Sequence, residues 1–455
     1  MASKNCSCKD STIVEGIFGE IHALDNGPSS GDFQSLSAGD GETSSTMIKS
    51  FTLSNSNRME VVVITWGATI VSLKCPDKYG RTADIVLGFE DLKSYMNPQL
   101  NQFFGCVLGR CANRVQNGTF SIKDKDYQLS LNENYKHHLH GGVRIDNRND
   151  PENILMTYMS EDDQEGYPGA VLSTIRFKLT PDNKLEIGMR ATTSKSTIVN
   201  LSHGSLFNLA GHDAGESELR KHRVSLNCDR WTFTDLADPV PTGAIRGVGG
   251  TVMDLRIPRI LDKFNSQVPP GEGFDHNFCV IRCLQPGVNF VGRALHAESG
   301  RILEVYSDQP GVQFYTGGRL PSESNPLDFS KDIHKKISEV RRKFNFASDR
   351  SFEEMSAVGE FEEYSDDTTT KEYLRYIPGK SGAKYEKFCA FSMQTQNYPN
   401  AVNFVSPIIL SVHRSKFNIL PFIPQSHFPC PVLRPGQVYY HDLTYKFGVQ
   451  LGNYM

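Results

Sequence analysis

The chain has 455 residues, a formal net charge of −4 and a sequence pI near 6.4. Its Lys and Arg residues are scattered without a basic tract, so neither nucleic acid nor an anionic membrane is an expected partner. No apolar run approaches transmembrane length, and the start MASKNCSCKD lacks the apolar core of a signal peptide. These features predict a soluble, cytoplasmic protein with neutral partners.

Residues 1–46 are rich in Ser, Gly and Asp and include GPSSGDFQSLSAGDGETSS. Such a composition cannot bury enough apolar surface to fold alone, which predicts a disordered or loosely packed tail. Residues 47–455 then form one domain. The ten cysteines show no zinc-ligand spacing, and most lie in apolar runs, where Cys acts as a small buried hydrophobe.

From residue 59 onward the chain reads as short strands separated by turn clusters such as DKYGR and PDNK. The strand segments are enriched in β-branched and aromatic residues and recur at roughly one per ten residues, with few convincing helices. This pattern predicts an all-β fold, a large antiparallel β-sandwich. The clearest predicted strands lie within residues 59–75, 118–132, 170–180, 184–192, 222–228 and 301–308.

Two segments interrupt this pattern. Residues 321–384 are polar, with the helix-compatible stretch KDIHKKISEVRRKF followed by the acidic EFEEYSDD. A loop of that length inside a compact domain is usually a functional lid or an insertion. Residues 404–427 are more apolar and are predicted to be a second insertion that packs on the domain.

Several polar residues stand out among apolar neighbours, and each has a structural alternative. Arg114, after Asn113 in GRCANRV, could clamp hydroxyl groups or serve as a half-buried salt-bridge partner. The histidines of HHLHGG suggest a metal, but no carboxylate or Cys accompanies them at ligand spacing, so a polar loop is the alternative. Asp275 in GFDHNF could be a turn residue, and Gln313 in GVQFYTGG needs a partner if it is buried.

Taken together and in this order, ten phrases closely resemble the aldose 1-epimerase (galactose mutarotase) family. The resemblance covers roughly residues 47–320 and 385–451, leaving out the tail and the insertions. It implies a β-supersandwich (galactose mutarotase-like) with a sugar cleft, interconversion of the α and β anomers of hexoses such as galactose or glucose, and no cofactor or metal. The phrases are VVVITWGATIVSLKCPDKYGRTADIVLGFEDLKSY, GRCANRV, LHGG, GYPGA, VNLSHGSLFNLAG, PTGA, GFDHNF, GVQFYTG, QTQNYPNAVN and VLRPGQVYYHDLTYKFGV.

The family's chemistry needs a general acid, a His that protonates the ring oxygen, and a general base, a Glu that takes the proton of the anomeric hydroxyl. The resemblance places the acid position at Gly204 and the base position at Gln394, so neither titratable group is present. An amide can hydrogen-bond a hydroxyl but cannot accept its proton. The resemblance also implies a set of substrate-binding residues: Asn113, Arg114, His140, Ser205, Asp275 and Gln313.

His203 is adjacent to the vacant acid position, but in a strand a neighbouring residue points to the opposite face. Three hypotheses follow. The first is a hexose-binding protein that is catalytically impaired or inactive. The second is an active epimerase with relocated groups, using His203 or His140 as acid and a carboxylate from elsewhere, such as residues 360–363, as base. The third is a structural or interaction protein whose 321–384 segment covers the cleft. The sequence makes no prediction of the oligomeric state.

Overall fold

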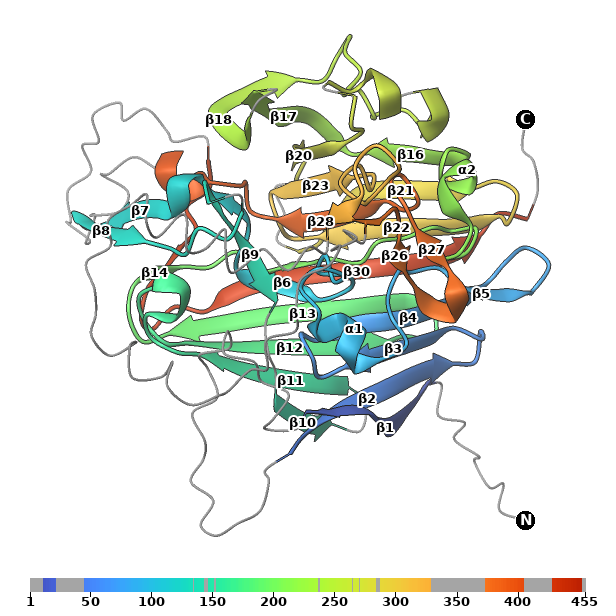
Figure 1. The fold of residues 1–455 in the computed structure, drawn as a ribbon, viewed down its shortest axis with the longest axis horizontal. Helices are drawn as coiled ribbons and strands as arrows, with labels where there is room; N and C mark the ends of the chain where they lie inside the picture. Colours follow the sequence, from blue (N-terminus) through green and yellow to red (C-terminus); the bar gives the residue numbers. More distant parts are fainter. Residues whose placement is uncertain are drawn as a thin grey trace, which may run out of the picture.

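A computed structural model describes residues 11–21, 45–133, 135–142, 146–150, 153–235, 238–263, 265–269, 271–283, 287–328, 373–404 and 428–451. In this part of the chain an antiparallel sheet of nine strands runs through the middle of the molecule (Figure 1). Its strands alternate buried and half-exposed residues, so one face meets the core. In spatial order they are β10 (Asp146–Asp150), β11 (Asn153–Ser160), β12 (Val171–Leu179), β13 (Lys184–Thr193), β30 (Tyr439–Val449), β22 (Arg301–Ser307), β21 (Asn289–His296), β16 (His222–Leu226) and β19 (Arg259–Ile260).

Two further antiparallel sheets pack on this central sheet, each over one half of it (Figure 1). The first comprises β1 (Ser11–Ile21), β2 (Thr46–Asn55), β3 (Glu60–Ile64), β4 (Thr69–Pro76) and β5 (Thr82–Asp84). The second comprises β18 (Asp238–Gly247), β17 (Cys228–Asp235), β20 (Asp275–Val280), β23 (Gly311–Tyr315) and β28 (Ser392–Gln396).

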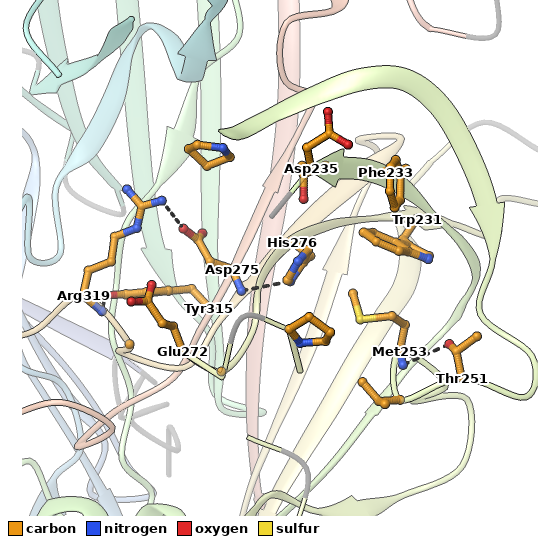
Figure 2. Close-up of a pocket in the computed structure, with 16 residues that line it drawn as sticks. Trp231, Phe233, Asp235, Thr251, Met253, Glu272, Asp275, His276, Tyr315 and Arg319 are labelled. Carbon is orange, nitrogen blue, oxygen red and sulfur yellow. Dashed lines mark hydrogen bonds and ion pairs between the residues drawn. The ribbon is translucent and has the colours of Figure 1, made fainter. Parts of the chain in front are cut away.

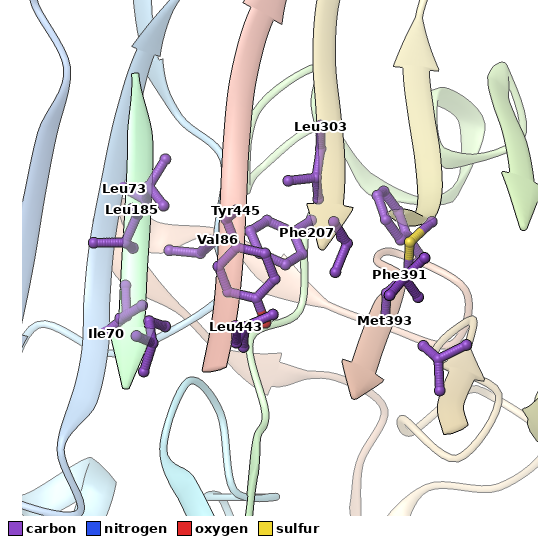
Figure 3. Packing of buried hydrophobic residues seen from close by; sticks show 14 of the residues in the cluster. Ile70, Leu73, Val86, Leu185, Phe207, Leu303, Phe391, Met393, Leu443 and Tyr445 are labelled. Atoms are coloured by element: carbon purple, nitrogen blue, oxygen red, sulfur yellow. The ribbon is translucent and has the colours of Figure 1, made fainter. Parts of the chain in front are cut away.

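One large apolar cluster fills the space between the sheets and draws side chains from all three (Figure 3). Ile70 and Leu73 of β4 lie opposite Leu185 of β13, while Met393 of β28 lies near Leu303 of β22. All five side chains are fully buried. The predicted large antiparallel β-sandwich is therefore confirmed, and the predicted strands within residues 59–308 are found.

Smaller elements complete the described part. The helices α1 (Leu92–Met96) and α2 (Gly215–Leu219) are both short, and no helix of the described chain is long and apolar enough to span a membrane. A three-stranded sheet of β15 (Ser202–His203), β6 (Val107–Val115) and β9 (His138–Gly142) supplies one wall of the cleft described below. The remaining strands pair in twos: β7 (Thr119–Ile122) with β8 (Lys125–Gln128), β14 (Thr197–Ile198) with β29 (Val432–Leu433), β24 (Leu327–Asp328) with β25 (Tyr373–Leu374), and β26 (Ile377–Pro378) with β27 (Lys384–Tyr385).

The segment 1–46, predicted to be a disordered or loosely packed tail, contains the strand β1. Ten of the eleven residues of β1 pair with β2, with a register shift between Ile17 and Gly19; Ile13 packs against the core and Ile21 is buried. The rest of that segment lies outside the described residues, apart from the start of β2. So do the helix-compatible stretch of 321–384 and nearly all of 404–427.

The described end of the 321–384 segment is tied firmly to the first sheet. Lys380 is buried, and its ammonium group donates to the Asp84 carboxylate at 2.6 Å and to the Val71 and Val86 carbonyl oxygens at 2.7 and 2.8 Å. The predicted burial of cysteines holds for most of the described ones, whereas Cys283 and Cys430 are exposed.

Candidate active-site cleft

A cavity of about 260 Å³ opens where β6 and β9 meet β20, β23 and β28. This volume lies near the lower end of the range for small-molecule pockets, about 300–1,000 Å³. Residues far apart in sequence line it, and the set includes seven of the eight predicted site residues: Asn113, Arg114, His140, Gly204, Asp275, Gln313 and Gln394. Apolar side chains complete the wall: Phe103, Phe104, Leu108, Leu139, Leu206, Tyr315 and Leu320.

Gln394 reaches the cavity because of its register in β28. Its neighbours Met393 and Thr395 are fully buried on the core side, and Thr395 Oγ1 lies 2.8 Å from His441 Nε2. Alternation then turns the Gln394 side chain to the opposite face, where it lines the cleft. Across the ladder Gln394 pairs with Gln313 of β23, so two amides stand side by side in the cleft floor.

Gly204 lies in the cleft wall immediately after β15, where its N–H donates to the Cys106 carbonyl oxygen at 2.9 Å. A Cβ atom built there would lie 3.0 Å from the Phe103 carbonyl oxygen and 3.5 Å from Leu108 Cδ1. That contact is tight, so a side chain at this position requires the Phe103 segment to move by a few tenths of an ångström. The wall of the cleft is thus adapted to a residue without a side chain.

The two neighbours of Gly204 face the core. His203 is fully buried between the rings of Phe177 and Tyr445, with centroids 6.3 and 6.0 Å away, and burial lowers its pKa to about 3. It does not line the cleft, which excludes it as the relocated acid. Ser205, for which a substrate contact was predicted, is also fully buried and does not line the cleft.

His140 is oriented by the backbone of Asn113. The Asn113 N–H donates to His140 Nδ1 at 3.0 Å, which leaves the proton of the neutral ring on Nε2, available to a ligand. Asn113 adopts a left-handed backbone conformation with φ of 66°, which Asn tolerates better than most residues. Desolvation, followed by the positive charge of Arg114, lowers the pKa of His140 to about 3. The ring therefore stays neutral and acts as a hydrogen-bond donor.

An alternating chain of charges crosses the cleft. Arg114 donates to Glu133 through Nε and Nη2, both at 2.6 Å, in a bidentate pair. Glu133 Oε1 also accepts from Arg319 Nη1 at 3.0 Å, and Arg319 Nη2 lies 3.0 Å from Asp275 Oδ2. The other Asp275 oxygen accepts from Gln313 Nε2 at 2.7 Å. The two arginines and two carboxylates sum to zero, so the wall suits an uncharged ligand.

This network keeps both carboxylates ionised. Burial opposes ionisation of Asp275, but the charges of Arg319 and Arg114 and the Gln313 hydrogen bond outweigh it and lower its pKa. Glu133 shows the same balance: hydrogen bonds and charges from Arg114 and Arg319 overcome the effect of burial on its pKa. A carboxylate with a lowered pKa is a weak proton acceptor, so Asp275 is suited to receive hydroxyl hydrogen bonds rather than to remove protons.

Glu133 and Arg319 were missed from the sequence. Each lies beside a phrase that was recognised, Glu133 just before HHLHGG and Arg319 just after GVQFYTGG. The sequence did not distinguish these two residues from others, because Glu and Arg are common in loops. Only the pairing of loops from distant parts of the chain shows that they link Arg114 to Asp275.

The histidines of HHLHGG do not converge on a metal. His137 Nδ1 accepts from the Asn117 N–H at 3.1 Å, and His138 Nδ1 lies 2.9 Å from the Ser130 carbonyl oxygen, whereas His140 faces the cleft. Elsewhere in the described chain Glu218, His296 and Glu298 lie close enough to share an ion. Lys221 already donates to both of those carboxylates, at 2.7 and 2.8 Å, which disfavours a metal there.

Comparison with known proteins agrees with the cleft and the fold. The aldose 1-epimerase family profile matches residues 49–416. Galactose mutarotase from Sus scrofa is 36% identical over 400 residues, covering 87% of this chain and 92% of the relative. The Homo sapiens galactose mutarotase is 34% identical with the same coverage. An Escherichia coli aldose 1-epimerase is 30% identical over 283 residues, covering 59% of this chain and 78% of the relative.

Solved structures show the same architecture. A GalM/aldose epimerase homologue from C. elegans superposes with a TM-score of 0.62 at 21% identity, covering 87% of this chain and 97% of the other. Galactose 1-epimerase from Lactobacillus acidophilus gives 0.60 at 18% identity, covering 89% and 95%. The fold is thus that of the galactose mutarotase-like β-supersandwiches. The chain itself belongs to the aldose 1-epimerase family.

Proposed function

We propose that this chain binds a hexopyranose, such as galactose or glucose, in the 260 Å³ cleft and interconverts its anomers slowly or not at all. The observation that carries this proposal is the pair of cleft positions held by Gly204 and Gln394, where the family resemblance expects the acid and the base. Neither residue can exchange a proton at the pH of a cell. General acid–base groups typically contribute about 10²–10⁴-fold each.

The remaining cleft supports binding. His140 offers Nε2–H, Asp275 offers carboxylate oxygens, and Gln313 and Gln394 offer amides, while Phe103 and Leu206 supply apolar surface. Mixed donors and acceptors beside an apolar wall suit the alternating hydroxyl and C–H surface of a pyranose. The zero net charge of the Arg114–Asp275 network favours a neutral sugar over a phosphorylated one. We further propose a reducing, cytoplasmic location, since the eight described cysteines are free thiols.

The test follows the anomerisation of α-galactose by polarimetry or NMR with purified protein. We expect a wild-type rate close to the spontaneous one and galactose binding in a thermal-shift or calorimetric titration. The Gly204→His/Gln394→Glu double variant should gain anomerase activity if the cleft is intact. Gly204→Ala is the matched control, because it adds the tight contact with Phe103 without adding an acid. A wild-type rate well above the spontaneous rate would refute the impaired-enzyme proposal.

An active epimerase remains the alternative that the names of the relatives favour, since several are called galactose mutarotase. In that case His140 is the acid candidate that lines the cleft, and the base is a carboxylate from elsewhere, such as residues 360–363, which lie outside the described residues. Activity that survives Gln394→Ala but is lost in His140→Gln and in a Glu360→Gln/Glu362→Gln/Glu363→Gln variant, both of which still bind galactose, would support this alternative. A protein that shows neither activity nor any sugar-dependent thermal shift would instead fit an interaction role with a covered cleft.

A further inference from the structure

Figure 2 shows a second cavity, of about 450 Å³, whose lining overlaps that of the cleft described above. It is larger than the cleft and lies between β17, β18 and the start of β20. The two cavities share three lining residues, Asp275, Tyr315 and Arg319, so the ion pair of Arg319 with Asp275 stands between them. Gly204 and Gln394 line the cleft but not this second cavity.

The walls of the second cavity are mainly aromatic and aliphatic. Trp231 and Phe233 of β17 lie on the same side of the cavity as Met253, across from Tyr315 and Arg319 (Figure 2). The Trp231 ring is held edge-to-face by Phe233, 5.5 Å between centroids, and by His276, 5.3 Å. The Arg246 guanidinium lies over the Phe233 ring, 3.3 Å from the ring centroid. Such a preformed aromatic wall favours a flat, apolar ring over a flexible polar chain.

The polar groups of this cavity are mostly acceptors. The lining contains three carboxylates, those of Asp235, Glu272 and Asp275. Its one cationic side chain is Arg319, which already forms ion pairs with Asp275 and Glu133. His276 accepts the Asp275 N–H at Nδ1, 3.2 Å away, and burial lowers its pKa, so the ring is neutral. An excess of negative charge disfavours an anionic ligand. It leaves the aromatic wall as the feature that selects a ligand group, and that wall suits a neutral aromatic ring.

We infer that the second cavity binds an aromatic substituent carried by the hexose, so that the preferred ligand is an aryl-substituted hexose spanning Arg319. This inference rests on the proposed function. The anomeric side of the sugar is assigned to Gln394, which is absent from the second cavity, whereas Asp275 lines both. The aromatic group is therefore attached to a hydroxyl other than the anomeric one, and the anomeric hydroxyl stays free.

The chain has two tryptophans, Trp66 and Trp231, and Trp66 lines neither cavity. In a Trp66→Phe variant all tryptophan fluorescence therefore comes from the second cavity. We would titrate this variant with galactose and with galactoses benzylated singly at O2, O3, O4 or O6. At least one benzylated galactose should bind about tenfold more tightly than galactose, because burial of a phenyl ring adds apolar area. It should also shift the emission of Trp231, which galactose alone should change little.

Trp231→Leu, made in wild-type protein and followed by calorimetry, should remove the gain from the benzyl group and leave galactose affinity within about twofold. Trp231→Phe should retain most of the gain. The inference is overturned if galactose binds but no benzylated form binds more tightly, or if the gain survives Trp231→Leu. A disaccharide that shows an equal, Trp231-dependent increase in affinity over galactose would indicate that the second cavity binds a second pyranose. That result would also overturn the inference. Absence of galactose binding would count against the proposed function itself.

Discussion

At the scale of single residues, Arg114 has the most demanding position in the cleft. Its guanidinium and the Glu133 carboxylate are 5% and 13% exposed, so both charges have lost most of their water. Removal of one partner from such a pair leaves the other buried and unpaired, which typically costs about 3–5 kcal/mol. The same residue also supports Asp275 electrostatically. Stability and ligand binding therefore depend on one side chain.

We expect Arg114→Gln to lower the free energy of unfolding by about 3 kcal/mol and to abolish hexose binding. Urea denaturation and calorimetry with galactose measure the two effects. Arg190→Gln is the matched control, because its ion pair with Asp442 is 34% and 43% exposed and such pairs contribute about 0–1 kcal/mol. Similar destabilisation by both variants would contradict this interpretation of the network.

At the scale of elements, β1 is an edge strand that adds to the first sheet without approaching the cleft. Val14 and Ile17 are 63% and 68% exposed, while Ile13 packs against the core and Ile21 is buried. Deletion of residues 1–21 should therefore cost about 2–5 kcal/mol of stability, because full burial of an Ile contributes about 1.5–3 kcal/mol, and Ile21 is buried whereas Ile13 is only partly buried. Galactose affinity should stay within about twofold of that of the full chain. A large loss of affinity in the truncated protein would show that β1 supports the cleft after all.

The sequence predicted those features of the fold and the site that follow from local pattern. Alternation in VNLSHGSLFNL placed Gly204 on one face and His203 on the other, as the structure shows. The same alternation places the Ser205 side chain in the core, although the family resemblance implied that it binds substrate. Strands with turn clusters were recognisable because their residues repeat with a period of two.

Features that depend on distant pairing escaped prediction. β1 lies in a segment whose average composition is that of a tail, yet ten of its eleven residues find a partner in β2. Arg319 gains its role because Glu133 and Asp275, from two other parts of the chain, come within 3.0 Å of it. No local signal encodes such a meeting, because burial and charge pairing depend on the tertiary fold.

At the scale of the whole molecule, several neutral histidines make stability depend on pH. Burial lowers the pKa of His203 and His222 to about 3 and that of His441 to about 4. In the unfolded chain the same rings titrate near 6.5. Below about pH 6.5 these histidines are protonated in the unfolded state but stay neutral in the folded state. The free energy of unfolding therefore keeps its full value above that pH and falls as the pH drops toward about 4. Each ring contributes about 1.4 kcal/mol per pH unit in this window.

Urea denaturation between pH 7 and pH 5 should therefore show a mean slope of about 3 kcal/mol per pH unit from these three rings, because the unfolded rings are only partly protonated near pH 7. His203→Leu keeps the side-chain volume and the apolar contacts with Phe177 and Tyr445. It should reduce the slope by about one third. An unchanged slope in this variant would mean that His203 is protonated in the folded protein.

The Arg319 bridge between Glu133 and Asp275 has one more consequence, for the effect of ionic strength. The Arg319 side chain is 39% exposed, so dissolved salt can weaken both of its ion pairs. The Debye screening length of the solution falls from about 10 Å at 0.1 M salt to about 3 Å at 1 M. The bridge shapes the wall shared by both cavities. Binding of an uncharged sugar should therefore respond to added sodium chloride, an effect that Arg319→Met should remove. A neutral ligand with a salt-sensitive affinity would show that this bridge, and not the ligand, carries the charge that matters.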